Sequence, residues 1–198
     1  MRALELDDDG AQPMRTQQYE TTIAVFRRVL AKVSPDQVDD PTPCASFNVA
    51  QLIDHGIATQ HMIIDALQDK PFNMAGVQVA PGEQPAAFDL AAANAVAELH
   101  RDGAMDKILE MPFGTFPGEH LMELCALDTF QHAWDLAKAT GQDTDLAPDI
   151  TDALMAVAAD HMAHAPRGEE PAPYGPEQTA PEGAPAADRL AAFLGRSV

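Results

Sequence analysis

Basic residues are scarce in this sequence, and their scarcity argues against two classes of partner. The chain has 12 Lys and Arg against 31 Asp and Glu, which gives a formal net charge of −19 at pH 7. Proteins that bind nucleic acid need basic patches for the phosphates, and anionic membrane surfaces make a similar demand. We therefore expect neither partner, and we interpret the acidity as a soluble, self-repelling surface.

Long apolar runs and cysteine pairs are also missing. No segment approaches the roughly 18 consecutive apolar residues that a membrane span needs, and residues 1–13 lack the apolar core of a signal peptide. The two cysteines, Cys44 and Cys125, form no disulfide framework, so reduced thiols in a cytoplasmic protein are the simpler expectation. A length of 198 residues suffices for one domain with a real core.

Helical periodicity dominates the rest of the chain. Residues 1–13 are polar and aperiodic, which predicts a flexible arm, and residues 108–118 predict a short extended segment with a tight turn. Apolar residues at three- and four-residue spacing predict helices over 14–33, 48–68, 86–101, 121–140, 148–164 and 187–196. We predict an all-α fold in which residues 14–198 form a single four-helix bundle domain with additional short helices. Short connections favour neighbouring helices that run antiparallel.

The second of these helices has clear start signals. Asn48 can be the N-cap, Gln51 follows three residues later as in a capping box, and Phe47 and Leu52 occupy the positions of a hydrophobic staple. His55 lies on the flank of the apolar face, where a histidine is commonly hydrogen-bonded or half-exposed.

The helix over 121–140 carries the most unusual pattern. Its apolar stripe is interrupted by Asp128, His132 and Asp135, and a buried carboxylate is costly unless it is paired, hydrogen-bonded or bound to a metal. Asp128 and His132 are four residues apart and point the same way, which suits two ligands on one ion. A buried Asp–His hydrogen bond without metal is the alternative.

Other titratable residues lack such spacing. His161 and His164 are three residues apart but lie near a helix end beside a proline-rich loop, so we expect them to be solvated. Cys125 has no cation near it in sequence to lower the pKa of its thiol, and we interpret it as a small core residue.

Four segments together resemble a known family. In order they are PTPCASFNVAQLIDH (41–55), MPFGTFPG (111–118), LDTFQHAWDLAKATGQ (127–142) and ADRLAAFLGR (187–196). They are similar to a bacterial family of metal-binding proteins in the DinB-like superfamily, related to the N-terminal domain of mycothiol-dependent maleylpyruvate isomerase. The resemblance implies a four-helix bundle that holds a divalent metal ion, usually zinc.

The resemblance also implies the ligands: one histidine of the second helix and a carboxylate-x-x-x-histidine pair of a later one. The matching positions are His55, Asp128 and His132. The family pattern has Glu where this chain has Asp128, and Gly-Trp where it has Ser46-Phe47. Three protein ligands leave a fourth position for water or substrate, as in catalytic zinc sites, and the same set suits Ni²⁺ or Fe²⁺.

Asp135 has two interpretations of equal weight. It can orient a ligand histidine or bound water from behind, or act as a base. Alternatively it is a helix-end charge, or pairs with Arg189 or another cation.

Two functions of different classes remain open. In the first, the metal activates a low-molecular-weight thiol, such as mycothiol, for attack on a small electrophile, as in a thiol-dependent transferase or isomerase. In the second, the protein is a non-catalytic metal-binding bundle with a stress-related or partner-binding role. A third possibility is that the site holds no metal and that Asp128 and His132 are simply paired. The sequence also leaves open whether the protein forms a homodimer.

Overall fold

The structure, a computed structural model, describes residues 11–73, 77–168 and 174–198, with side chains from residue 16 onward. Within these ranges it is mostly helical, with one short hairpin, as predicted. The elements are α1 (Ala11–Leu30), α2 (Val49–Leu67), α3 (Gln84–Leu99), β1 (Ile108–Met111), β2 (Gly114–Pro117), α4 (Gly118–Ala139), α5 (Pro148–Met162) and α6 (Ala186–Phe193).

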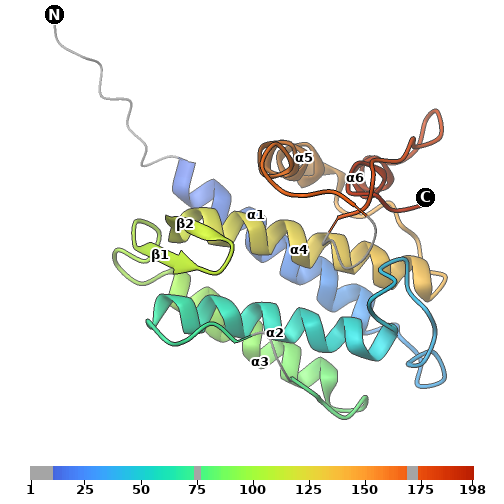
Figure 1. The fold of residues 1–198 in the computed structure, drawn as a ribbon. Helices are drawn as coiled ribbons and strands as arrows, with labels where there is room; N and C mark the ends of the chain where they lie inside the picture. Colours follow the sequence, from blue (N-terminus) through green and yellow to red (C-terminus); the bar gives the residue numbers. More distant parts are fainter. Residues whose placement is uncertain (1–10, 74–76, 169–173) are drawn as a thin grey trace, which may run out of the picture.

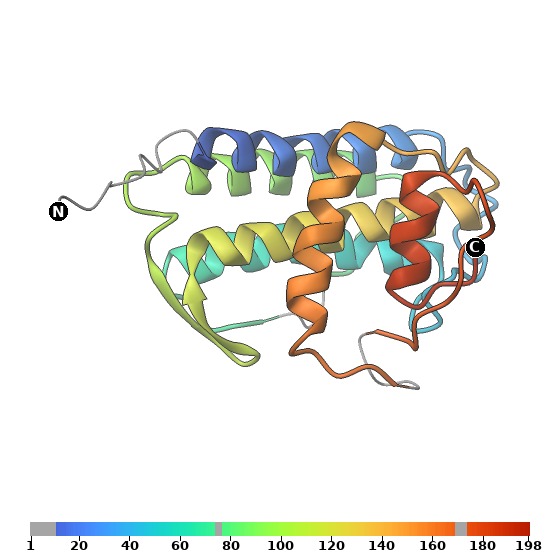
Figure 2. The same cartoon turned by 90° about the horizontal axis from the view of Figure 1, so that it is seen from above.

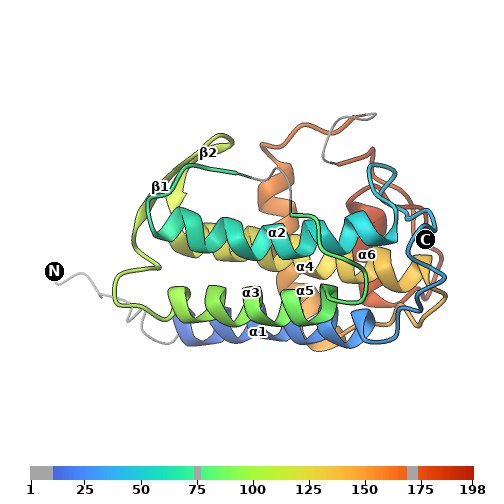
Figure 3. The same ribbon diagram turned by 90° about the horizontal axis from the view of Figure 1, so that it is seen from below.

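The four long helices α1 to α4 form the bundle, with α1 beside α4 and α2 beside α3 (Figure 1). Helices α2 and α3 run parallel, because Gln84 at the start of α3 bonds Ala50 while Gln68 beyond the end of α2 bonds Glu98. The expectation that short connections give antiparallel neighbours does not apply to this pair, because the connection between the two helices is long. It runs from residue 68 to residue 83, and its described residues cross back along the bundle before α3 begins, as Figure 3 shows.

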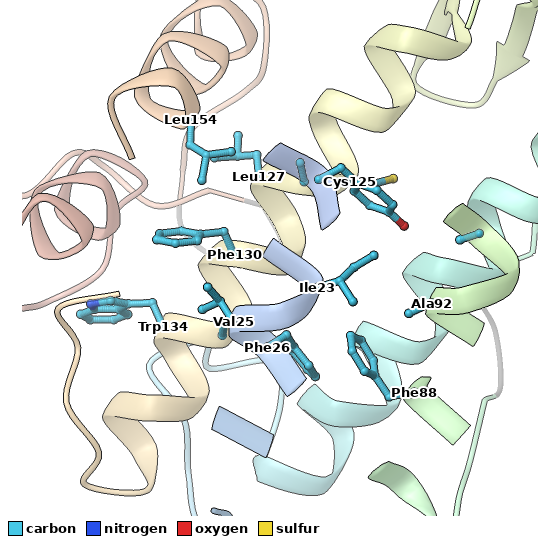
Figure 4. Close-up of a cluster of buried hydrophobic side chains, with 14 of the residues drawn as sticks. Ile23, Val25, Phe26, Phe88, Ala92, Cys125, Leu127, Phe130, Trp134 and Leu154 are labelled. Atoms are coloured by element: carbon cyan, nitrogen blue, oxygen red, sulfur yellow. The ribbon is translucent and has the colours of Figure 1, made fainter. Parts of the chain in front are cut away.

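Helices α5 and α6 lie outside the bundle and cross α4 steeply (Figure 2). Side chains of the bundle and of α5 and α6 meet in one continuous apolar core, and α4 lies at its centre. In Figure 4, Ile23 and Phe26 of α1 and Phe88 of α3 lie on one side of α4, and Leu154 of α5 lies on the other. The rings of Phe26 and Phe88 stack with centroids 4.5 Å apart. Helix α4 is therefore covered on both sides, which explains its fifteen buried residues.

Local signals in the sequence set several helix boundaries. The predicted capping box is present: the Asn48 side chain accepts from the backbone of Gln51, and the Gln51 side chain accepts from the backbone of Asn48. Gly141, the predicted residue after the helix over 121–140, has a positive φ of 67°, which glycine adopts without strain. Helix α1 begins at Ala11, three residues earlier than predicted, and the rest of the predicted arm, residues 1–10, lies outside the described residues.

The predicted extended segment is an antiparallel hairpin. Ile108 pairs with Pro117 and Met111 with Gly114, so the turn is at Pro112-Phe113 and α4 starts directly after β2, at Gly118. No helix in the described part of the chain is long and apolar enough to cross a membrane.

Candidate metal centre

Helices α2 and α4 bring three of the residues singled out in the sequence together. The two helices run antiparallel, so His55, near the start of α2, lies beside the middle of α4. Its Nε2 is 3.5 Å from Oδ1 and 3.4 Å from Oδ2 of Asp128, and Nε2 of His132 is 3.4 Å from Oδ1 of the same carboxylate. One ligand atom from each of the three residues lies within 4.8 Å of the others.

These nitrogen–oxygen distances are informative because they are longer than ordinary N–H···O hydrogen bonds, which cluster near 2.9 Å. Ligands at about 2.1 Å from a tetrahedral ion are separated from one another by about 3.4 Å. The spacing between the carboxylate and each imidazole therefore matches the edge of a metal-coordination tetrahedron better than it matches a tight Asp–His pair.

Asp128 is held in place by one hydroxyl group. The Thr59 hydroxyl donates to Oδ2 over 2.9 Å, and the side chain of Asp128 is about one-third exposed, at 33%. Burial acts to raise the pKa of Asp128, but His132 and His55 outweigh it and hold the pKa well below its usual value. The group is thus an ionised carboxylate with lone pairs directed at two imidazoles.

His132 is oriented from behind by Asp135. Its Nδ1 lies 3.0 Å from Oδ2 of Asp135, so an Nδ1–H donates to this carboxylate and Nε2 is directed toward Asp128. A carboxylate on the far nitrogen of a ligand histidine is a recurrent arrangement around protein-bound zinc. The geometry fits the interpretation of Asp135 as the residue that orients a ligand.

Asp135 is also paired with a cation, but not with Arg189. Arg196 donates through Nε and Nη2 to the two oxygens of Asp135 over 2.9 and 3.1 Å, and Gln131 adds a third donor at 3.3 Å. Arg189 instead donates to the backbone oxygen of Ala184. The expected pairing of Asp135 with a cation is present, but the cation is Arg196, which follows α6, and not Arg189 within that helix.

The charges in this network support one another. Burial lowers the pKa of His132, but Asp128 and Asp135 more than offset it and raise the pKa to about 10. Burial likewise raises the pKa of Asp135, yet His132 and Arg196 bring the net value below normal. A cation bound at Nε2 of His132 would replace a proton there, so metal binding and protonation compete for this atom.

Phe47 contacts both histidines. Its ring stacks on His55 with centroids 4.9 Å apart and meets the His132 ring edge-on at 6.1 Å. The sequence assigned Phe47 only to a staple, so this contact with the candidate ligands was missed.

The two cysteines differ. Cys125 is fully buried in the core, as expected. Cys44 has its sulfur within 4.8 Å of ligand atoms of His132 and Asp135, a grouping that the sequence did not suggest. Asp135 is already engaged by Arg196, and burial raises the pKa of the Cys44 thiol. This second group is therefore less suited to an ion than the first.

A cavity of about 370 Å³ opens beside the centre. The three candidate ligands and Cys44 line it together with residues from the C-terminal part of the chain, among them Tyr174, Gly175, Gly195 and Arg196. Gly195 has a φ of +95°, and a Cβ there would lie 2.7 Å from Gly175, so glycine is needed where these two segments meet. No motif in the sequence signalled Tyr174, and Arg196, although it ends the segment 187–196 that carried the resemblance, was given no role there.

The remaining histidines lie elsewhere. His164 is exposed, as expected, but His161 is half-buried and its ring meets the Tyr174 ring at 5.6 Å. Burial lowers the pKa of His161, so the expectation that it is solvated holds only in part. His61 is exposed, and His100 pairs with Glu20 on the surface.

Two histidines and a carboxylate on neighbouring helices define a helical bundle protein with a candidate metal centre. The family model described as the mycothiol maleylpyruvate isomerase N-terminal domain matches residues 19–137. The chain belongs to this family, and the matched region contains all three candidate ligands.

Relatives and solved structures agree with this assignment. Two uncharacterized proteins of Mycobacterium tuberculosis, from strains CDC 1551 and H37Rv, are 35% identical over 178 residues, which covers 87% of this chain and 92% of theirs. The crystal structure of a mycothiol-dependent maleylpyruvate isomerase superposes with a TM-score of 0.61 at 13% identity, covering 76% of this chain and 69% of that one. A histidine-to-alanine mutant of that enzyme gives the same TM-score. The structural likeness establishes the shared fold.

Proposed function

We propose that this protein is a metal- and thiol-dependent transferase or isomerase in which His55, Asp128 and His132 hold a divalent ion, most simply Zn²⁺. The observation that carries the proposal is the spacing of 3.4–3.5 Å between the carboxylate of Asp128 and the two imidazoles. Two imidazoles and a carboxylate also suit Ni²⁺ and Fe²⁺. When bound, the ion supplies Lewis-acid chemistry that favours the thiolate form of a thiol.

The protein groups around the centre support this role. Thr59 holds Asp128 and Asp135 holds the ring of His132, so both ligands are oriented before an ion binds. Three protein ligands leave one position for a non-protein group, which is the pattern of catalytic zinc sites. The adjoining cavity has polar groups on its wall, including Gln131 and Tyr174, as expected of a site that binds substrate.

The choice of thiol and electrophile rests on the family. The enzyme of the superposed structure is described as mycothiol-dependent and as a maleylpyruvate isomerase. We carry a low-molecular-weight thiol of this kind, and a small electrophile, over to this chain as part of the proposal.

Elemental analysis and a thiol-dependence assay test the proposal. Protein purified without chelator should contain about one metal ion per chain and should isomerise maleylpyruvate, or conjugate monochlorobimane, only when mycothiol is present. His132→Ala should lose both metal and activity. His61→Ala removes an exposed histidine on the same helix as His55 and should retain both.

Two other results would contradict the proposal in different ways. Equal rates for metal-loaded and metal-free protein would remove the role of the ion. Stoichiometric metal without turnover of either probe would instead favour the non-catalytic metal-binding bundle.

A further inference from the structure

A groove lies along one edge of the hairpin, at the end of α2 that is remote from His55. Strand β1 lies beside the C-terminal half of α2, as Figure 3 shows. The groove has a volume of about 460 Å³, and all four residues of β1 line it, whereas no residue of β2 does. A hollow over one face of the hairpin would instead be lined by alternate residues of both strands. The groove therefore follows the edge of β1.

The opposite wall is a helix face and the segment that follows it. Met62, Asp65 and Ala66 of α2 lie on one face of the helix, and Lys70 and Phe72 continue the wall beyond its end. A strand edge that faces a helix across a groove has the layout in which an extended peptide adds to an exposed sheet edge.

The backbone of β1 has hydrogen-bonding groups on the side of the groove. The N–H of Gly118 donates to the oxygen of Lys107 over 2.8 Å, and this bond extends the β1–β2 ladder by one pair. Because bonded and non-bonded pairs alternate in an antiparallel ladder, the backbone groups of Ile108 and Glu110 are directed away from β2. They form no backbone hydrogen bond on that side with the residues that the structure describes. The outer edge of β2 is a poorer template, since Pro117 has no N–H.

Large apolar side chains are exposed at this groove. Ile108 is 64% exposed, Phe113 51% and Phe72 41%, and the rings of Phe72 and Phe113 meet edge-on at 5.9 Å. In the described part of the chain, the other exposed side chain of this kind is Leu90, which stands alone on α3. A cluster of exposed apolar side chains marks an interaction site, whereas a single one does not.

The charges around the groove favour a basic occupant. Lys70 pairs with Asp65 over 3.2 Å, and Lys107 pairs with Asp69 over 2.8 Å. Glu110 is exposed and has no cationic partner within the described ranges. A second copy of this chain, with its net charge of −19, would bring the same acidic wall against the first. A segment that carries Lys or Arg would instead supply the missing charge.

We propose that the groove binds an extended basic segment of another protein, which adds to the hairpin as a third strand beside β1. The backbone groups of Ile108 and Glu110 bond the backbone of the segment. On the solvent face, the Glu110 carboxylate pairs with a Lys or Arg of the added strand. Alternate apolar side chains of the segment enter the groove and contact Met62 and Phe72. The inference does not involve the metal centre and is independent of the proposed function.

A synthetic peptide of alternating basic and apolar residues, fluorescein-labelled RVKVRV amide, tests this proposal on the full-length protein. Fluorescence anisotropy should show saturable binding at one site per chain. The same peptide with every backbone nitrogen methylated keeps its charges and side chains but has no N–H donor. It should bind at least about tenfold more weakly.

Two proline variants test which edge of the hairpin is used. Ile108→Pro removes an N–H on the outer side of β1, at the first residue of the strand, where proline is tolerated. It should weaken peptide binding by about tenfold. Thr115→Pro removes the corresponding N–H from the outer side of β2, because Thr115 is the residue paired with Glu110. This matched control should change the affinity by less than about twofold.

A charge variant tests the predicted ion pair without altering the backbone. Glu110→Gln should weaken peptide binding about threefold at low ionic strength, and the difference should disappear at about 0.5 M NaCl. Glu182→Gln removes an exposed carboxylate far along the chain from the hairpin and should have no such effect.

Two sets of results would overturn the proposal. If the methylated peptide or the Ile108→Pro variant binds as well as its unmodified counterpart, the peptide is held only by general attraction to an acidic protein. If sedimentation shows that wild type and Thr115→Pro are dimers while Ile108→Pro is a monomer, the occupant of the groove is a second copy of this chain.

Discussion

Asp128 and Asp135 are the same residue type, two turns apart on the same face of α4, yet their surroundings differ. Asp135 is completely buried and receives donors from His132, Gln131 and Arg196. Asp128 is one-third exposed, at 33%, and receives a hydrogen bond of ordinary length only from Thr59. The number of donors, rather than the helix position, decides which carboxylate has lone pairs left for an ion.

The comparison also separates two kinds of buried charge. Asp135 and Arg196 compensate each other within the protein, so removing one leaves the other unpaired in the interior. Asp128 faces two imidazoles and no guanidinium, so its removal does not leave an arginine unpaired in the interior. We expect Asp135 to matter for folding and Asp128 for metal binding.

The largest predicted effect is on stability. Asp135→Ala should lower the free energy of unfolding of the metal-free protein by about 3–5 kcal/mol, because Arg196 becomes a buried, unpaired cation. Asp128→Ala should cost less, about 1–2 kcal/mol, through the lost hydrogen bond from Thr59 and the lost attraction to His132. Urea denaturation of both variants measures the difference in the free energy of unfolding. Similar decreases in the two variants would show that Asp128 and Asp135 contribute equally to folding.

The next largest predicted effect is on stabilisation by zinc, for which Asp128 should matter more than Asp135. Zinc at about 100 times its Kd should stabilise the wild-type protein by about 2.7 kcal/mol, since an ion that binds only the folded state adds its binding energy to folding. Asp128→Ala should show none of this gain, and a chelator should abolish it in wild type. Zinc stabilisation of Asp128→Ala equal to that of wild type would exclude Asp128 as a ligand.

The sequence predicted most of the bundle because helix formation here follows local rules. Asn48 and Gln51 form the capping box that their spacing indicated, and Gly141 ends the helix where its freedom of φ is needed. The parallel course of α2 and α3 could not be predicted, because a long connection fits either direction. Hydrogen bonds between distant residues, such as Gln84 to Ala50, decide it.

The candidate site divides in the same way. Asp128 and His132 are one turn apart, so the helix alone places them side by side, and the family resemblance supplied His55. Arg196 and Tyr174 reach the site only through the irregular path of the last residues, which has no periodicity to read. Thr59 was missed for another reason: a threonine on a helix face is ordinary, and only its 2.9 Å bond to Asp128 gives it a role.

Thr59 provides the smallest predicted effect and sharpens the comparison. Thr59→Val keeps the shape of this buried side chain but removes the donor to Asp128, so the carboxylate should be less well oriented for an ion. We expect zinc affinity to fall about fivefold, equivalent to about 1 kcal/mol for one hydrogen bond. Thr22→Val, which removes an equally buried hydroxyl bonded to the backbone of Tyr19, should leave zinc affinity unchanged. Competition with a chromogenic chelator measures both values. Equal zinc affinity for wild type and Thr59→Val would mean that the hydrogen bond from Thr59 does not orient Asp128 for the ion. The difference between Asp128 and Asp135 would then not depend on that hydrogen bond.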